Sequence, residues 1–183
     1  MVRAMAHPTS AENTRGRMKL LTISAAIWFA LDQISKYIVV HAMGLIERGI
    51  IEVAPPFLTF KMGWNRGINF GLMSGGPELT RWILIAVALA ICAWLVWWAR
   101  HGLTRPIALL SAGAIIGGAL GNTIDRVLYG AVADFLNMSC CGINNPFAFN
   151  VADIGIFVGA FGLLICANDT KMADDEKIDG DGA

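Results

Sequence analysis

The stretch Gly121-Asn122-Thr123-Ile124-Asp125-Arg126 places a carboxylate at the end of a strongly apolar segment. A second stretch, Phe149-Asn150-Val151-Ala152-Asp153, places another at the start of an apolar segment, again with an asparagine three residues earlier. Because a carboxylate at membrane depth is costly, its default interpretation is functional. The two motifs therefore predict chemistry that needs paired carboxylates, namely activation of water by a dyad of Asp125 and Asp153.

The composition of the chain indicates a membrane protein. Of its 183 residues, 56% are hydrophobic and only 15% are charged, which is well below the charged share of soluble domains. Four segments have the length of about 20 apolar residues that a spanning helix needs, at residues 20–40, 80–99, 106–128 and 149–167. We therefore predict an all-α membrane protein with four transmembrane helices in one catalytic domain, residues 1–168. An acidic, disordered cytoplasmic tail is expected to follow at residues 169–183.

Basic residues set the expected orientation in the membrane. They gather in the N-terminal segment and between the second and third spans, at Arg3, Arg15, Arg17, Lys19, Arg100 and Arg105. The connection between the third and fourth spans, residues 129–148, has none. The positive-inside rule then places both termini in the cytoplasm. It also brings Asp125 and Asp153 to the same depth, at the extracytoplasmic face.

The first loop, residues 41–79, is expected to form a surface element. Its segment Ile50–Phe60 is rich in β-branched and aromatic residues and contains Pro55-Pro56, which favours an extended edge strand. We predict a small sheet at the extracytoplasmic membrane surface. The loop carries three basic residues against the positive-inside pattern, but it is long enough to fold, and folded segments can be translocated with their charges.

The spacing within each motif suggests how its side chains cooperate. Residues three and four apart share a face of a helix, so Asn122, Asp125 and Arg126 point the same way, as do Asn150 and Asp153. Two neighbouring carboxylates share a proton, so one would act as base on water while the other protonates the carbonyl oxygen. The structural alternative is that Asp125 pairs with Arg126 or another cation and joins helices.

Three further charged residues lie near these motifs. Asp32 and Lys36 are four apart in the first span. A simple intrahelical pair competes there with a role in bracing an interface loop or a lipid headgroup. Asp134 lies just outside the third span, where a helix N-cap or a loop hydrogen bond is favoured.

Several other sites and partners are disfavoured. No histidine has a second ligand at metal spacing, so neither a metal site nor a cofactor is expected. No basic run interleaves with aromatic residues, which argues against nucleic acid. Cys140 and Cys141 are adjacent in an outer loop, where free thiols or loop packing are favoured over a disulfide. Small residues every four positions favour helix packing within a monomer over dimerisation, at Gly113, Gly117 and Gly121.

Four collinear motifs resemble those of bacterial lipoprotein signal peptidases, the signal peptidase II family. They are Asp32-Gln33-Ile34-Ser35-Lys36, Asn65-Arg66-Gly67-Ile68-Asn69-Phe70-Gly71, Gly121 to Arg126 with Gly130 and Asp134-Phe135, and Phe149 to Asp153. Together they cover most of the chain. One departure is visible: the family commonly has two alanines where this chain has Ile68 and Asn69, which leaves loop or substrate detail open.

The resemblance implies a membrane aspartic endopeptidase of the bacterial inner membrane, with its active site at the extracytoplasmic face. Its partners would be membrane lipid and lipid-modified prolipoproteins, whose signal peptide it cuts off just before a diacylglyceryl-bearing cysteine. Carried over by motif, the catalytic dyad is Asp125 and Asp153. The supporting or substrate-binding residues are Asp32, Lys36, Asn65, Gly67, Asn122, Arg126 and Asn150.

Two functions of other classes stay open at this point. A small transporter could use the two aspartates as ion sites, although the second span has no ionisable residue between Arg81 and Arg100. A scaffold subunit could use them only to pair helices. Replacing either aspartate by asparagine would then reduce stability, whereas a protease would stay folded and become inactive.

Overall fold

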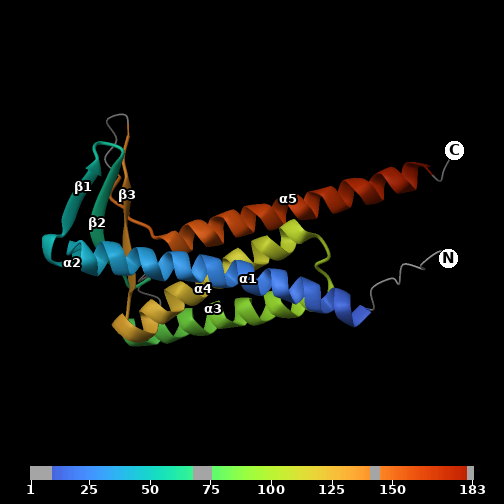
Figure 1. Cartoon of the computed structure of the whole chain (residues 1–183), viewed down its shortest axis with the longest axis horizontal. Coiled ribbons are helices and arrows are strands. Elements are labelled where there is room, and N and C mark those ends of the chain that lie inside the picture. Colours follow the sequence, from blue (N-terminus) through green and yellow to red (C-terminus); the bar gives the residue numbers. More distant parts are fainter. Residues whose placement is uncertain (1–9, 68–75, 141–144, 181–183) are drawn as a thin grey trace, which may run out of the picture.

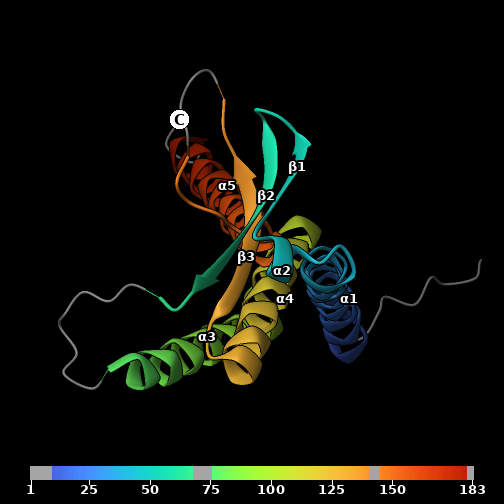
Figure 2. The same cartoon turned by 90° about the vertical axis from the view of Figure 1, so that its left-hand side faces the viewer.

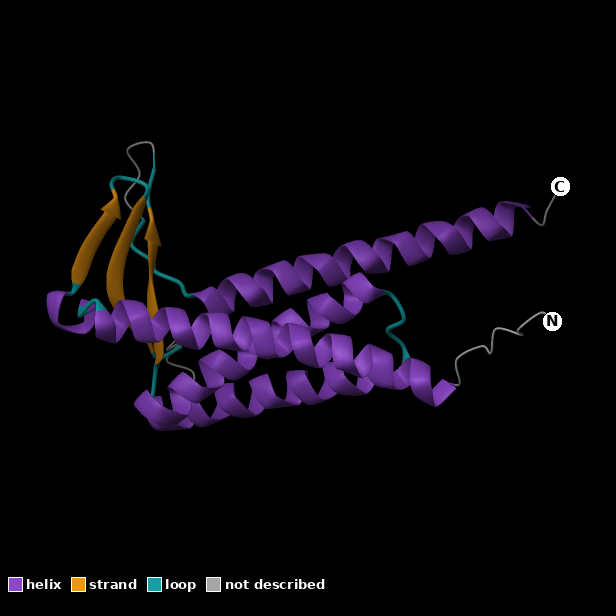
Figure 3. Ribbon diagram, viewed as in Figure 1, coloured by secondary structure: helices purple, strands orange, loops and turns teal. Residues whose placement is uncertain are grey.

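The computed structural model describes residues 10–67, 76–140 and 145–180 (Figure 1). In chain order the elements are α1 (Ser10–Lys36), the π-helix η1 (Tyr37–Ala42), α2 (Leu45–Arg48), β1 (Ile50–Ala54), β2 (Leu58–Asn65), α3 (Gly76–His101), α4 (Pro106–Tyr129), β3 (Val132–Met138) and α5 (Val151–Gly180). The long helices form an elongated bundle and the strands gather at one end of it (Figure 3). Helix α1 begins, and α5 ends, at the opposite end (Figure 1).

Three helices in the described part of the chain are long and apolar enough to cross a membrane: Ala11–Ala42, Glu78–His101 and Pro106–Tyr129. They coincide with the first three predicted spans. The fourth predicted span falls on α5, whose apolar part, Val151–Cys166, is shorter.

Helix α5 itself continues to Gly180. Residues 169–180 are therefore helical where an irregular tail was expected. Acidic character alone does not prevent this, because the segment also contains residues of high helix propensity, such as Lys171, Met172 and Ala173.

Helix α4 lies at the centre of the bundle and contacts α1, α3 and α5. Its glycines explain how closely its neighbours approach. A Cβ atom on Gly113 would lie 2.6 Å from the carbonyl oxygen of Leu21 in α1, and one on Gly118 would meet the carbonyl of Ala152 in α5. The repeat that contains Gly113 and Gly117 thus lets α4 approach α1 closely, and the neighbouring Gly118 lets it approach α5.

The sheet is antiparallel, with the strand order β1-β2-β3. Strand β2 pairs with β1 through Phe60 and Ile51, and with β3 through Phe60 and Leu136. The small sheet predicted from the first loop is present and takes two strands from it, but β3 comes from the connection between α4 and α5 and was not predicted. The aromatic rings of Phe60 and the buried Phe135 meet edge to face at 5.8 Å. This core packs the sheet against η1, α2 and the start of α5, at one end of the bundle (Figure 2).

Cys140, which follows β3, is exposed and disulfide-bonded. The favoured interpretation of a free or packed thiol is therefore wrong for this residue. Two thiols that lie in contact form a disulfide in an oxidising environment. Cys141 lies outside the described residues.

Candidate active site

Polar side chains from four elements meet where the helix bundle joins the sheet. They come from α1, the C-terminal part of α4, strand β3 and the start of α5, as Asp32, Lys36, Asn122, Asp125, Asp134, Asn150 and Asp153. All except Asp153 are buried, and Asp153 is half-buried. Because buried polar groups are costly unless they are paired, the partners of each one indicate its role.

Lys36 holds two carboxylates at once. Its Nζ atom lies 2.7 Å from Oδ2 of Asp32 and 2.8 Å from Oδ2 of Asp125. It also donates to Oδ1 of Asn122 over 3.2 Å. The intrahelical pair considered from the sequence is present, but Lys36 additionally joins α1 to α4.

Asp32 is fully buried and ties α1 to the start of α5. Its Oδ1 atom accepts a hydrogen bond from the backbone N–H of Ala152 over 2.9 Å. Gly121 makes room for this carboxylate, because a Cβ atom there would lie 2.5 Å from Oδ2 of Asp32. The position of the Asp32 carboxylate thus depends on the glycine that begins the Gly121–Arg126 motif.

Asp125 is surrounded by partners that favour a structural role. Besides Lys36, it accepts hydrogen bonds from the backbone N–H of Ala133 at 3.1 Å and from Nε2 of Gln33 at 3.4 Å. Its side chain is 3% exposed. A carboxylate compensated by a cation and two donors matches the structural alternative left open above, in which Asp125 pairs with a cation and joins helices.

Asn150 and Asp153 form a capping box at the start of α5. The backbone N–H of Asp153 donates to Oδ1 of Asn150 over 2.9 Å, and that of Asn150 donates to Oδ2 of Asp153 over 3.3 Å. This reciprocal pattern satisfies two N–H groups of the first helical turn. The other oxygen of Asp153 accepts from Nδ2 of Asn122 over 2.9 Å. The asparagine of one Asn-x-x-Asp motif therefore donates to the aspartate of the other motif.

Asp134 joins this group, although the sequence suggested only a cap or loop hydrogen bond for it. Its Oδ1 atom accepts from Nδ2 of Asn150 over 2.6 Å, and Asn65 also donates to it. Burial and then the charge of Asp153 raise the pKa of Asp134 to about 6, against the lowering influence of its hydrogen bonds and of Lys36. Two carboxylates that influence each other in this way are the electrostatic pattern of an acid–base pair.

The remaining predicted site residues lie around the same group. Arg126 donates from Nη1 to the backbone carbonyl of Asn122 over 3.4 Å, and its charge acts on Asp153, Asp134 and Asp125. Asn65 accepts from the backbone N–H of Gly67 over 2.9 Å, which orients its amide.

Gly67 has a positive φ of 87°, and a Cβ atom there would lie 2.6 Å from Cδ1 of Leu84. Glycine is therefore required at this position. Ile68 and Asn69 lie outside the described residues.

The side chains of Asp125 and Asp134 lie on different sides of β3. A cavity of about 150 Å³ is lined by Asp125, Lys36, Trp64 and Ala133, among others. Because successive strand residues point to opposite faces, Asp134 projects away from this cavity. In the described part of the chain, no group of three or more His, Cys, Asp or Glu side chains is arranged to hold a metal ion.

Comparison with known proteins shows the family to which this chain is similar. The family model described as "Signal peptidase (SPase) II" matches residues 24–168. A "Lipoprotein signal peptidase" of Methylobacterium sp. (strain 4-46) is 43% identical over 143 residues, which cover 78% of this chain and 84% of that protein. A second of that name, from Rhodopseudomonas palustris (strain ATCC BAA-98 / CGA009), is 39% identical over 151 residues, 80% of this chain and 90% of its own.

Solved structures are similar to this chain in fold as well. One described as a bacterial membrane enzyme, at 28% sequence identity, has a TM-score of 0.70 and covers 82% of this chain and 93% of its own. Another of that description has a TM-score of 0.69 and covers 84% and 90%.

Proposed function

Because this chain belongs to the signal peptidase II family of aspartic peptidases, which remove signal peptides from prolipoproteins, we propose that its catalytic dyad is Asp134 with Asp153. The observation that carries this proposal is the position of Asn150. It caps α5 together with Asp153 and donates from the same side chain to Asp134 over 2.6 Å. One residue thus contacts both carboxylates, because its side-chain amide donates to Asp134 and its backbone N–H donates to Asp153 over 3.3 Å.

The environments of the two aspartates suggest their roles. Asp153 is half-buried, so water and a peptide can reach it, and two N–H donors orient its oxygens. Asp134 is buried and its pKa is raised to about 6. We assign Asp153 as the base that takes a proton from the attacking water, and Asp134 as the acid that protonates the carbonyl oxygen. The tetrahedral intermediate then breaks as a proton is returned to the leaving nitrogen.

Asp125 is the alternative partner, predicted from the sequence motif. Its contacts argue against it, because Lys36 lies 2.8 Å away and the backbone N–H of Ala133 occupies the same oxygen. An oxygen that already accepts from an ammonium group and a backbone N–H is poorly placed to bind and activate a water molecule. We therefore assign Asp125 to the network of Asp32 and Lys36 that holds α1, α4 and α5 in place.

Binding of the lipid group explains how a scissile bond would reach this dyad. We propose that the chain lies in the bacterial inner membrane as a monomer with four spans, the fourth being the apolar part of α5, and with both termini in the cytoplasm. The dyad would then lie at the extracytoplasmic face. A diacylglyceryl group on the substrate cysteine would fix the depth of the bond through its acyl chains, at about 0.8 kcal/mol per buried methylene, and misplacement at this step is costly.

The test is cleavage by the purified full chain of matched precursors, with and without the diacylglyceryl group, at equal membrane concentration. Cleavage just before the modified cysteine is expected, and the unmodified precursor should be cut far more slowly. Similar rates for both precursors would show that the site recognises peptide sequence alone and would contradict the lipid-dependent function.

A further inference from the structure

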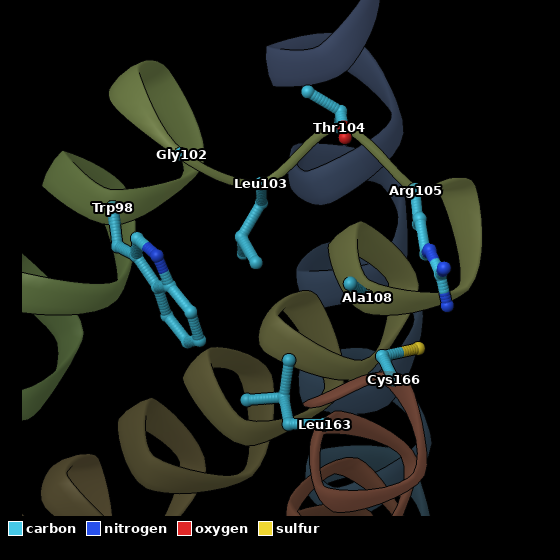
Figure 4. A pocket seen from close by; sticks show the side chains of 8 residues that line it. All are labelled: Trp98, Gly102, Leu103, Thr104, Arg105, Ala108, Leu163 and Cys166. Atoms are coloured by element: carbon cyan, nitrogen blue, oxygen red, sulfur yellow. The ribbon is translucent and has the colours of Figure 1, made fainter. Parts of the chain in front are cut away.

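A second cavity lies at the end of the bundle opposite the sheet, where α3 turns into α4 (Figure 4). Its volume is about 260 Å³. It is enclosed by the last turns of α3, the connecting turn, the first turn of α4 and residues Leu163 and Cys166 of α5. None of its residues belongs to the peptidase site.

The interior of this cavity is apolar. Figure 4 shows Trp98, Leu103 and Leu163 converging on it. Leu103 and Ala108 are buried, and Trp98 is half-buried. Gly102 lets the indole of Trp98 lie against the turn, because a Cβ atom there would lie 2.8 Å from Nε1 of the ring. The walls therefore suit a hydrocarbon chain.

The rim of the cavity is polar and cationic. Thr104 and Arg105 line it and are exposed. Arg17 of α1 donates to the backbone carbonyls of Leu103 and Arg100, over 3.3 Å in each case, which fixes the turn and places a second guanidinium beside it.

Among the side chains that the structure describes on the helix segments around the cavity, residues 11–21, 96–109 and 160–166, the acidic residue is Glu12 and the basic residues are Arg15, Arg17, Lys19, Arg100 and Arg105. Charge complementarity thus favours an anion at the rim.

We propose that this cavity binds an anionic phospholipid, with the phosphate at Arg105 and Thr104 and part of one acyl chain against Trp98, Leu103 and Leu163. An apolar interior beneath a cationic rim matches the two ends of such a molecule. Arginine binds phosphate through two parallel N–H donors, and basic pockets between membrane helices bind anionic headgroups.

The test is native mass spectrometry of the full chain, released from micelles that contain equal amounts of dioleoyl-phosphatidylglycerol and dioleoyl-phosphatidylcholine. We expect the wild type to retain the anionic lipid over the zwitterionic one by about fivefold or more. Arg105→Gln removes the charge of an exposed rim residue but keeps a polar side chain, and should bring the ratio close to one. Arg48→Gln, an exposed charge at the sheet end of the molecule, is the matched control and should leave the ratio unchanged.

Two further measurements distinguish binding of the whole lipid from binding of its phosphate alone. Ala108→Phe fills the cavity but keeps Arg105, and should reduce retention of the anionic lipid. Inorganic phosphate in excess should not displace that lipid, because the acyl chain contributes to binding. Equal retention of the two lipids by the wild type, an unchanged ratio in Arg105→Gln, unchanged retention in Ala108→Phe, or displacement by phosphate alone would each overturn the proposal.

Discussion

The side-chain amide of Asn150 donates to the Asp134 carboxylate over 2.6 Å and thereby joins the first turn of α5 to strand β3. Both residues are buried, and Asn150 is fully enclosed. The same asparagine forms a capping box with Asp153. A residue that serves helix capping and carboxylate positioning at once links the stability of the helix start to the geometry of the proposed dyad.

Lys36 is predicted to be essential for stability. Lys36→Met leaves the carboxylates of Asp32 and Asp125 buried without their cation, which costs on the order of 3–5 kcal/mol. Arg48→Ala removes an exposed loop charge and should change stability by less than about 0.5 kcal/mol. Thermal unfolding of the purified variants in detergent measures both. The double variant Lys36→Met/Asp125→Asn should recover part of the loss, and equal unfolding temperatures for Lys36→Met and wild type would refute the ion-pair network.

Gly121 is predicted to tolerate no side chain. Gly121→Ala would place a Cβ atom 2.5 Å from Oδ2 of Asp32, so the helices must shift, at a cost of roughly 1–3 kcal/mol. Gly16→Ala is the matched control, because a Cβ atom there has nothing within 4 Å and should stabilise its helix by up to about 1 kcal/mol. Unfolding temperatures that rise for both variants would show that α1 and α4 do not approach as described.

The stability of the protein should depend on pH through Asp134. Its pKa in the folded state, about 6, lies above the ordinary value of 3.8. The folded protein therefore holds a proton that the unfolded chain releases. This contribution to stability is present below about pH 4 and is lost as the pH rises through 6, with an upper limit of roughly 3 kcal/mol.

Asp134→Asn removes this titration, so the variant should gain stability relative to wild type at pH 7.5 compared with pH 4. Unfolding temperatures at the two pH values measure the gain. Glu52→Gln, which removes an exposed carboxylate on β1, is the control. If the unfolding temperatures of Asp134→Asn and wild type differ by the same amount at both pH values, the pKa of Asp134 is not raised.

The proposed topology can be checked at Cys140. This residue is exposed and disulfide-bonded, so reduction should precede labelling. A membrane-impermeant thiol reagent applied to intact cells from which the outer membrane has been made permeable should then label it. Cys92 is buried in α3 and should not react. Labelling that occurs only after the inner membrane is opened would place the sheet, and with it the dyad, on the cytoplasmic side.

Much of the fold followed from local sequence signals, and the exceptions have physical causes. Long apolar stretches marked the first three spans, and β-branched residues marked the first two strands. Strand β3 was missed because Val132–Met138 becomes a strand only by pairing with β2, more than 60 residues earlier. The helical tail was missed because acidic composition was taken as disorder.

The sequence identified the motifs of the candidate site but not the contacts between them. The structure brings the two Asn-x-x-Asp motifs together through Asn122 and Asp153. The spacing did not reveal that Asn150 reaches Asp134 or that Lys36 reaches Asp125, because these contacts connect different elements. Asp134 gave two usable signals: Asp134-Phe135 belongs to the third motif that resembles the family, and a carboxylate among the apolar residues of Val132–Phe135 is costly to bury unless it is paired.

The most direct test of the account compares Asp134→Asn, Asp125→Asn and Asp153→Asn in cleavage of a diacylglyceryl-modified precursor, at equal amounts of folded protein. Asparagine preserves the shape of each side chain but cannot carry the proton. We predict that Asp134→Asn and Asp153→Asn lose roughly 10²–10⁴-fold in rate, while Asp125→Asn retains most activity and unfolds at a lower temperature. An Asp134→Asn variant that cleaves at the wild-type rate, beside an inactive and folded Asp125→Asn variant, would contradict the proposed dyad and restore the pair predicted from the motifs.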